Sequence, residues 1–127
     1  MNYDLWLALL DIESSLKINL IDRYGSAENV YNDFEYIQSH EKIKSKNLKK
    51  IEKNFLWDEV CKNEEKLYKN GIGFITYADS LYKETFRRIL DPPYFLFFKG
   101  NIQVINNYSI GVIGARKCSN YGLSATK

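Results

Sequence analysis

Two adjacent prolines, Pro92-Pro93, constrain the fold of this chain more than any other feature of its sequence. Proline has a fixed φ and no backbone N–H, so the pair ends a preceding helix and forces the chain to be extended. The prolines lead into an aromatic, apolar run over residues 94–98, which is typical of a β-strand. Gly100-Asn101 follows and predicts a turn. The second half of the chain is therefore predicted to contain β-structure.

The residues before Gly71 have a different pattern of apolar side chains from those after it. Before this residue, apolar side chains recur every three or four positions, as on the buried face of an α-helix. Gly25 is a plausible C-cap and Ser26 a plausible N-cap between two of these segments. We predict helices over about residues 5–12, 16–24, 27–31 and 57–70.

After Gly71 the composition favours strands separated by turns. Asp79-Ser80 is suited to begin a helix that the prolines would end. We predict strands over 72–77, 94–98 and 109–113 and a helix over 81–90. Helices followed by a β-α-β order predict a fold class of α+β to α/β, with a small α-helical domain at 1–71 leading into an α/β domain at 72–127.

The composition bounds the setting in which the chain works. It has 127 residues, 45% of them apolar, and a formal net charge of +2, which permits an anionic partner without requiring one. No apolar run reaches the roughly 18 residues that span a bilayer, and the first apolar run is cut at Asp11 without a basic segment before it. Cys61 and Cys118 form no Cys-x-x-Cys motif, so no metal site or disulfide is predicted. We expect a reduced, cytoplasmic protein with no membrane partner.

A lysine-rich stretch over residues 41–53 is open to two interpretations. It could be a helix that grips phosphates, or an ordinary solvated helix face. Charge runs of this kind are usually solvated faces, so we favour the second interpretation. The lysines are Lys42, Lys44, Lys46, Lys49, Lys50 and Lys53.

A glycine turn after the predicted third strand is the best candidate for a binding site. Ligands of α/β sheets bind at the carboxyl ends of strands, which is where Gly114 stands. Gly114 would allow a sharp turn and a close approach, while the planar guanidinium of Arg116 suits phosphate oxygens. Lys117 adds a cation, and Ser119 could donate to a phosphate or cap the next helix. The alternative is a purely structural turn in which Arg116 pairs with a carboxylate.

These residues resemble a known family. The turn Gly114-x-Arg116 followed by Ser119-x-Tyr121-Gly122, preceded by Asp91-Pro92-Pro93, a short strand and Lys99-Gly100-Asn101, is similar to the DNA-processing protein A (DprA/Smf) family. The resemblance extends over roughly residues 72–125. Members of that family bind single-stranded DNA and hand it to RecA during natural transformation.

The resemblance implies a fold and a set of roles. It implies a small helical domain similar to a SAM or helix-hairpin-helix module, followed by the beginning of a Rossmann-like domain that is incomplete at Lys127. It implies that Arg116 holds the phosphodiester backbone, with Gly114, Lys117 and Ser119 around it. It implies no enzymatic activity, no catalytic residue, no cofactor and no metal. RecA contact and self-association would belong to the part of the family's domain that lies beyond Lys127.

Other interpretations remain. A Rossmann-type enzyme could hold a mononucleotide at the glycine turn, although the Gly-x-Gly-x-x-Gly spacing is absent. The chain could also be a helical protein-interaction module. The aromatic residues of 94–98 could stack on bases, although alternation along a buried strand explains them equally. Finally, we expect the segment from Asp91 on to be poorly ordered or paired with another copy.

Overall fold

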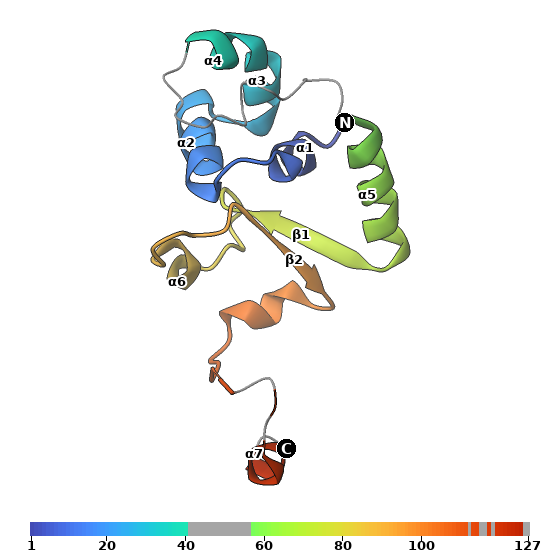
Figure 1. Cartoon of the computed structure of the whole chain (residues 1–127), viewed down its shortest axis with the longest axis vertical. Helices are drawn as coiled ribbons and strands as arrows, with labels where there is room; N and C mark the ends of the chain where they lie inside the picture. The colour runs from blue at the N-terminus through green and yellow to red at the C-terminus, as the bar shows by residue number, and fades with distance from the viewer. Residues whose placement is uncertain (41–56, 112, 115–116, 118, 126–127) are drawn as a thin grey trace.

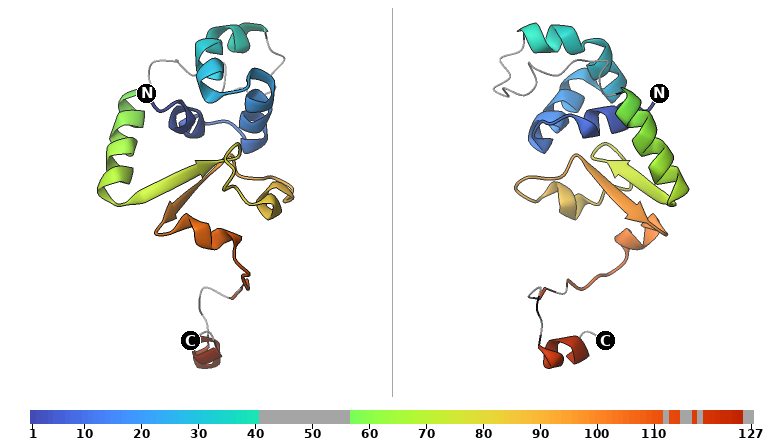
Figure 2. Two further views of the ribbon diagram at one scale, coloured as in Figure 1. Left: turned by 180° about the vertical axis from the view of Figure 1, so that it is seen from behind. Right: turned by 45° about the vertical axis from the view of Figure 1, so that its right-hand side comes forward.

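The computed structural model describes residues 1–40, 57–111, 113–114, 117 and 119–125. Helices α1–α5 form one layer, and a small sheet of two strands crosses beneath α1 and α5 (Figure 1). The short helix α6 and the 3-10 helix η2 lie on the opposite side of the sheet (Figures 1 and 2). The architecture is therefore a mixed helix and sheet arrangement of the α+β kind, as predicted.

Helix α1 begins, and helix α2 ends, at a residue suited to cap it. In α1 (Tyr3–Leu9), the Asn2 side chain accepts the backbone N–H of Leu5. Helix α2 (Ser14–Tyr24) ends at Gly25, which has a φ of 84°. This left-handed conformation favours glycine, so the predicted C-cap is confirmed.

The remaining helices enclose an apolar core. They are α3 (Ala27–Asn32), α4 (Phe34–His40) and α5 (Trp57–Lys69). Ser26 caps α3 by accepting the N–H of Asn29 at 3.1 Å, as predicted, whereas α4 was not predicted. Trp6 lies fully buried at the centre, edge-on to Tyr31 and Phe34. The predicted phosphate-gripping or solvated face at 41–53 lies outside the described residues.

Strands β1 (Ile72–Thr76) and β2 (Phe95–Lys99) confirm two of the predicted strands. They pair antiparallel, with Phe74 opposite Phe97. Just beyond the end of β1 and just before the start of β2, the N–H of Tyr77 donates to Tyr94 O at 2.7 Å. A parallel β-α-β unit needs a crossover helix long enough to return along the sheet. The connection between β1 and β2 has one helix, α6 (Glu84–Arg87), which is only four residues long. The strands run in opposite directions because such a short helix cannot return the chain along the sheet.

The predicted helix over 81–90 is confirmed only as the four residues of α6, and its predicted bounds are wrong. Asp79 does not cap it. Its carboxylate instead accepts the N–H of Thr76 at 2.7 Å and the Thr76 hydroxyl at 2.9 Å, which turns the chain back onto β1. Tyr82 is buried and its hydroxyl donates to Pro93 O at 2.7 Å. These contacts hold residues 79–82 in a turn, because the Asp79 carboxylate and the Tyr82 hydroxyl bond to residues at the ends of the two strands and not to the backbone of a helix.

The part of the chain after Asp91 differs from its prediction in two ways. Residues 95–99 are not poorly ordered, because they form a strand that pairs with β1, and Tyr94 just before them is 1% exposed. Pairing of this segment with another copy stays a prediction. The predicted strand over 109–113 is wrong for its described residues, which adopt no regular structure. Ile110 and Ile113 are exposed there, since no neighbouring strand in the described part of the chain supplies backbone partners. The 3-10 helix η2 (Ile102–Asn106) precedes this segment.

The division into domains at residue 71 stays a prediction, as does the start of a Rossmann-like domain at 72–127. The structure does show apolar packing across residue 71, because Tyr94 belongs to the same buried cluster as Trp6 and Val60.

Candidate functional site

The predicted binding loop lies apart from the helices and the sheet. Helix α7 (Asn120–Ala125) stands well away from the rest of the described chain in all views (Figures 1 and 2). Gly114, Lys117 and Ser119 are all exposed. Arg116 lies outside the described residues. The described residues of the loop are thus accessible to a large anionic partner such as a nucleic acid strand.

Ser119 acts as a cap of α7. Its hydroxyl accepts the N–H of Gly122 at 3.3 Å, and its carbonyl accepts the N–H of Leu123 at 3.1 Å. Of the two predicted roles for Ser119, the cap is therefore the one the structure shows. The hydroxyl proton is free to point elsewhere, since the oxygen acts as the acceptor in this bond.

Gly114 has a different property from the one predicted. The glycines with positive φ in the described residues are Gly25, Gly71 and Gly100, so Gly114 does not adopt the φ values that other residues resist. The close-approach argument remains, since no atom lies within 4 Å of the position that a Cβ on Gly114 would take.

The aromatic run over 94–98 does not form a base-stacking platform. Tyr94 is buried, and the Phe95 ring packs edge-on against Phe97 at 4.8 Å between centroids. Phe98 covers Gly73 on the facing strand, where a Cβ would come within 2.3 Å of its ring. Phe97, at 52% exposure, is the single clearly exposed aromatic of the run. These side chains are used in packing, which was the alternative interpretation.

The motif residues that flank this run make structural contacts. Pro93 O accepts the Tyr82 hydroxyl, as described above. Gly100 has a φ of 95° in the turn after β2, and the Asn101 side chain accepts the N–H of Gln103 at 2.9 Å to begin η2. The segment from Asp91 to Asn101 thus fixes the position of η2 relative to the sheet.

A pocket of about 570 Å³ lies where α1, the α2–α3 junction, α5 and the turn after β1 meet. Its ionisable lining is acidic and consists of Asp4, Glu28, Glu64 and Asp79. Burial raises the pKa of Asp4, while a hydrogen bond from Tyr94 acts in the opposite direction and Asp79 adds to the rise. A pocket lined in this way repels phosphates, so it is not a nucleic acid site.

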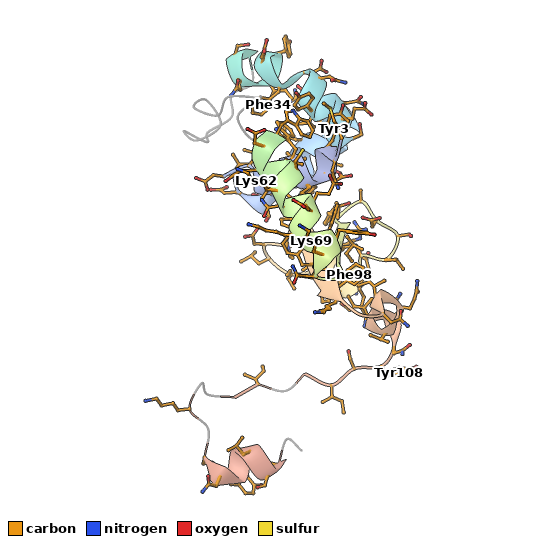
Figure 3. All side chains as sticks on the ribbon, turned by 90° about the vertical axis from the view of Figure 1, so that its right-hand side faces the viewer. Tyr3, Phe34, Lys62, Lys69, Phe98 and Tyr108 are labelled. Atoms are coloured by element: carbon orange, nitrogen blue, oxygen red, sulfur yellow. The ribbon has the colours of Figure 1, made fainter. Side chains whose placement is uncertain are left out.

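Charge is divided unevenly along the sequence. Residues 1–40 and 57–72 hold five Lys and Arg against eleven Asp and Glu, whereas residues 73–127 hold seven against three. The helical layer described above is therefore acidic outside 41–56, and the sheet, α6 and the segment that follows are basic. Lys62 and Lys69, both on α5, belong to the acidic part (Figure 3). Electrostatic attraction of an anionic nucleic acid strand is therefore expected at residues 73–127 and not at the acidic helices.

A second hollow, of about 660 Å³, was not found by sequence reasoning. It lies between the start of α6 and the residues that follow η2. Its lining consists of Lys83, Thr85, Asn106, Asn107, Tyr108 and Ser109. In the sequence, Asn106-Asn107 is a loop signal, and the tyrosine that follows it is the signal that could have indicated a contact surface.

Other kinds of site find little support in the part of the chain that the structure describes. There, no three His, Cys, Asp or Glu side chains group as metal ligands would, and Cys61 is an exposed free thiol on α5. Among the same residues, no helix has both the length and the apolar character needed to cross a bilayer.

Comparison with known proteins agrees with the motif residues. The family model of DNA recombination-mediator protein A matches residues 73–127, a range that runs from β1 through α7 and includes Gly114, Arg116, Lys117 and Ser119. No curated protein and no solved structure matches the chain. The match over residues 73–127 therefore supports a relationship of this part of the chain to the DNA recombination-mediator protein A family.

Proposed function

We propose that this chain binds single-stranded DNA and acts as a mediator of DNA recombination in the cytoplasm. The family match over residues 73–127 is the observation that carries this proposal. Its residues also hold the basic excess of the chain, and the described residues of its loop at 114–119 are exposed. The role is one of binding and presentation rather than of catalysis.

The loop at 114–119 would contact the phosphodiester backbone. Arg116 offers a planar fork of donors to phosphate oxygens, and Lys117 adds a second cation. Ser119 can turn its hydroxyl proton toward a phosphate while its oxygen still caps α7. Gly114 leaves space for the strand to approach the backbone, since nothing occupies the position of its absent side chain.

The partners follow from the same family. A protein that holds a single strand by its phosphates leaves the bases accessible, which suits transfer of the strand to RecA and protection of incoming DNA in natural transformation. We propose RecA and a further copy of the protein as partners. We also propose two domains. The first, at 1–71, is a helical domain of SAM or helix-hairpin-helix type, and the second is a Rossmann-like domain that begins at residue 72.

The test measures affinity of the chain for a fluorescein-labelled poly-dT oligonucleotide by anisotropy, over a range of salt concentrations. Each phosphate contact with a single strand contributes a slope of about 0.7 in log affinity against log salt. We expect Arg116→Ala to weaken binding about tenfold and to reduce the slope by one contact. Lys62→Ala, on the acidic part of the chain, is the matched control and should change neither quantity.

Two outcomes would oppose the proposal. An unchanged affinity and slope for Arg116→Ala would remove Arg116 from the interface. Saturable binding of ATP or NAD by calorimetry, together with no retention of the oligonucleotide, would favour a nucleotide-binding enzyme instead.

A further inference from the structure

We propose that the cleft between α6 and residues 106–109 is a second contact site for single-stranded DNA. In this site the Lys83 ammonium contacts a phosphate and the Tyr108 ring stacks on a base. The inference rests on the proposed function, and it adds a site separate from the loop at 114–119.

The cleft is formed by two segments that are far apart in sequence. Lys83 precedes the first residue of α6, and Tyr108 follows η2 where the chain leaves the folded part (Figure 3). The hollow between them measures about 660 Å³. Its polar lining groups, besides Lys83, are the Asn106 and Asn107 amides and the Ser109 and Thr85 hydroxyls. A strand in the cleft would therefore meet one cation, several neutral donors and acceptors, and one aromatic ring.

Lys83 is available for a phosphate. The nearest carboxylate in sequence, Glu84, lies 3.7 Å from Arg87 Nε and 3.6 Å from Arg88 Nε, so two other cations neutralise it. Within the described residues no ion pair engages Lys83 itself. The cleft thus carries a net positive charge at its edge.

Tyr108 is fully exposed, with a relative accessibility of 110%. Exposed aromatic rings are the platforms on which proteins stack the bases of single strands, because every base has a π-face. A tyrosine beside an unpaired lysine supplies both requirements of a single-strand site, a ring for the base and a cation for the backbone. Duplex bases are stacked on each other and cannot reach the ring, so the site selects single strands.

The position of the cleft suits a strand that also contacts the loop. Four residues lie between Ser109 and Gly114, and the five Cα-to-Cα steps that join the two positions span at most about 18 Å. One oligonucleotide of several nucleotides can therefore lie in the cleft and reach the loop. The acidic pocket beside α1 shares no lining residue with the cleft and does not compete for the strand.

The experiment measures poly-dT affinity of the 127-residue chain and maps photo-cross-links from a 4-thiothymidine-substituted oligonucleotide. We expect Tyr108→Ala to weaken binding about tenfold with an unchanged salt slope, because stacking is not ionic. We expect Lys83→Gln to reduce the slope by about 0.7. Tyr68→Ala and Lys62→Gln are matched controls, since Tyr68 is 88% exposed on α5 and both residues lie in the acidic part.

The outcomes separate this inference from the proposed function. Cross-links at residues 83–85 or 106–109, with the losses given above, support the cleft. Cross-links confined to 114–119, with wild-type affinity in Tyr108→Ala and Lys83→Gln, overturn the cleft and leave the proposed function intact. Absence of any oligonucleotide binding by the wild-type chain overturns both.

Discussion

The Tyr94 hydroxyl donates a hydrogen bond to Asp4 Oδ1 at 3.1 Å, across 90 positions of sequence. Tyr94 is buried directly after the double proline, and Asp4 stands in the first turn of α1, where backbone N–H groups favour a carboxylate. Burial raises the pKa of Tyr94, and the neighbouring charge of Asp4 raises it further. The tyrosine therefore stays protonated and remains a donor. This bond attaches α1 to the family-matched part of the chain.

The Asp4 carboxyl should make stability depend on pH. Its pKa is raised above 3.8 in the folded chain, mainly by burial. Between pH 3.8 and the raised value, the folded chain holds a proton that the unfolded chain has lost. The stabilisation is therefore complete below pH 3.8 and is lost as the pH rises through the folded pKa. Urea unfolding at a series of pH values measures it, and Asp4→Asn should abolish this step.

Tyr94→Phe tests the same bond from the other side. The substitution leaves the buried carboxylate without its donor, which we expect to lower the free energy of unfolding by about 1–2 kcal/mol at pH 7. Since the hydrogen bond lowers the pKa of Asp4, its loss should raise that pKa and move the step to higher pH. Equal stability of Tyr94→Phe and wild type at pH 7 would show that the bond does not form.

Lys17 should give a dependence of the opposite sign. It is 6% exposed, its ammonium donates to Ala8 O at 2.5 Å, and burial lowers its pKa from 10.5 to about 8. Between pH 8 and 10.5 the unfolded chain holds a proton that the folded chain has released, so stability rises with pH by up to about 3 kcal/mol. Lys17→Met should remove the rise in urea unfolding. A rise of the same size in that variant would assign it to other groups.

The helices and strands were predictable because their signals are local. Apolar spacing identified α1, α2 and α5, and the caps at Ser26 and Gly25 depend only on neighbouring residues. The two strands were found from their composition for the same reason. Helix α4 was not predicted because the sequence between α3 and the lysine-rich stretch is mostly polar. Phe34 and Ile37, which are buried, are too few to show the repeat of apolar residues typical of a helix.

The errors concern residues whose conformation depends on distant partners. Aspartate is a common N-cap residue of helices, but the Asp79 carboxylate accepts hydrogen bonds from the Thr76 N–H and hydroxyl instead. Residues 110 and 113 are apolar enough for a strand, yet a strand forms only where another backbone pairs with it. The cleft beside α6 could not be predicted either, since Lys83 and Tyr108 are brought together only by the antiparallel pairing of β1 with β2.

Gly73 should tolerate no side chain without a loss of packing. A Cβ there would lie 2.3 Å from Phe98 Cζ, so Gly73→Ala must displace the ring from the face of the sheet. We expect a loss of about 1–2 kcal/mol in the free energy of unfolding, measured with urea. Gly111→Ala is the matched control, because nothing lies within 4 Å of its Cβ position and its φ is not positive. Equal stability of both variants would mean that Phe98 does not pack there.

Ser119→Asp separates the cap of α7 from the contact with DNA. Aspartate caps helices as well as serine does, so the bond from the Gly122 N–H should be retained and the amide chemical shifts of α7 should change little. The new negative charge would lie beside the proposed phosphate site, so we expect poly-dT affinity to fall about tenfold at low salt and the difference to shrink as salt screens it. Ser119→Ala is the control: it should fray α7, with a loss of about 1 kcal/mol in cap energy, and leave affinity closer to wild type. Wild-type affinity in Ser119→Asp at low salt would place the DNA strand away from this loop.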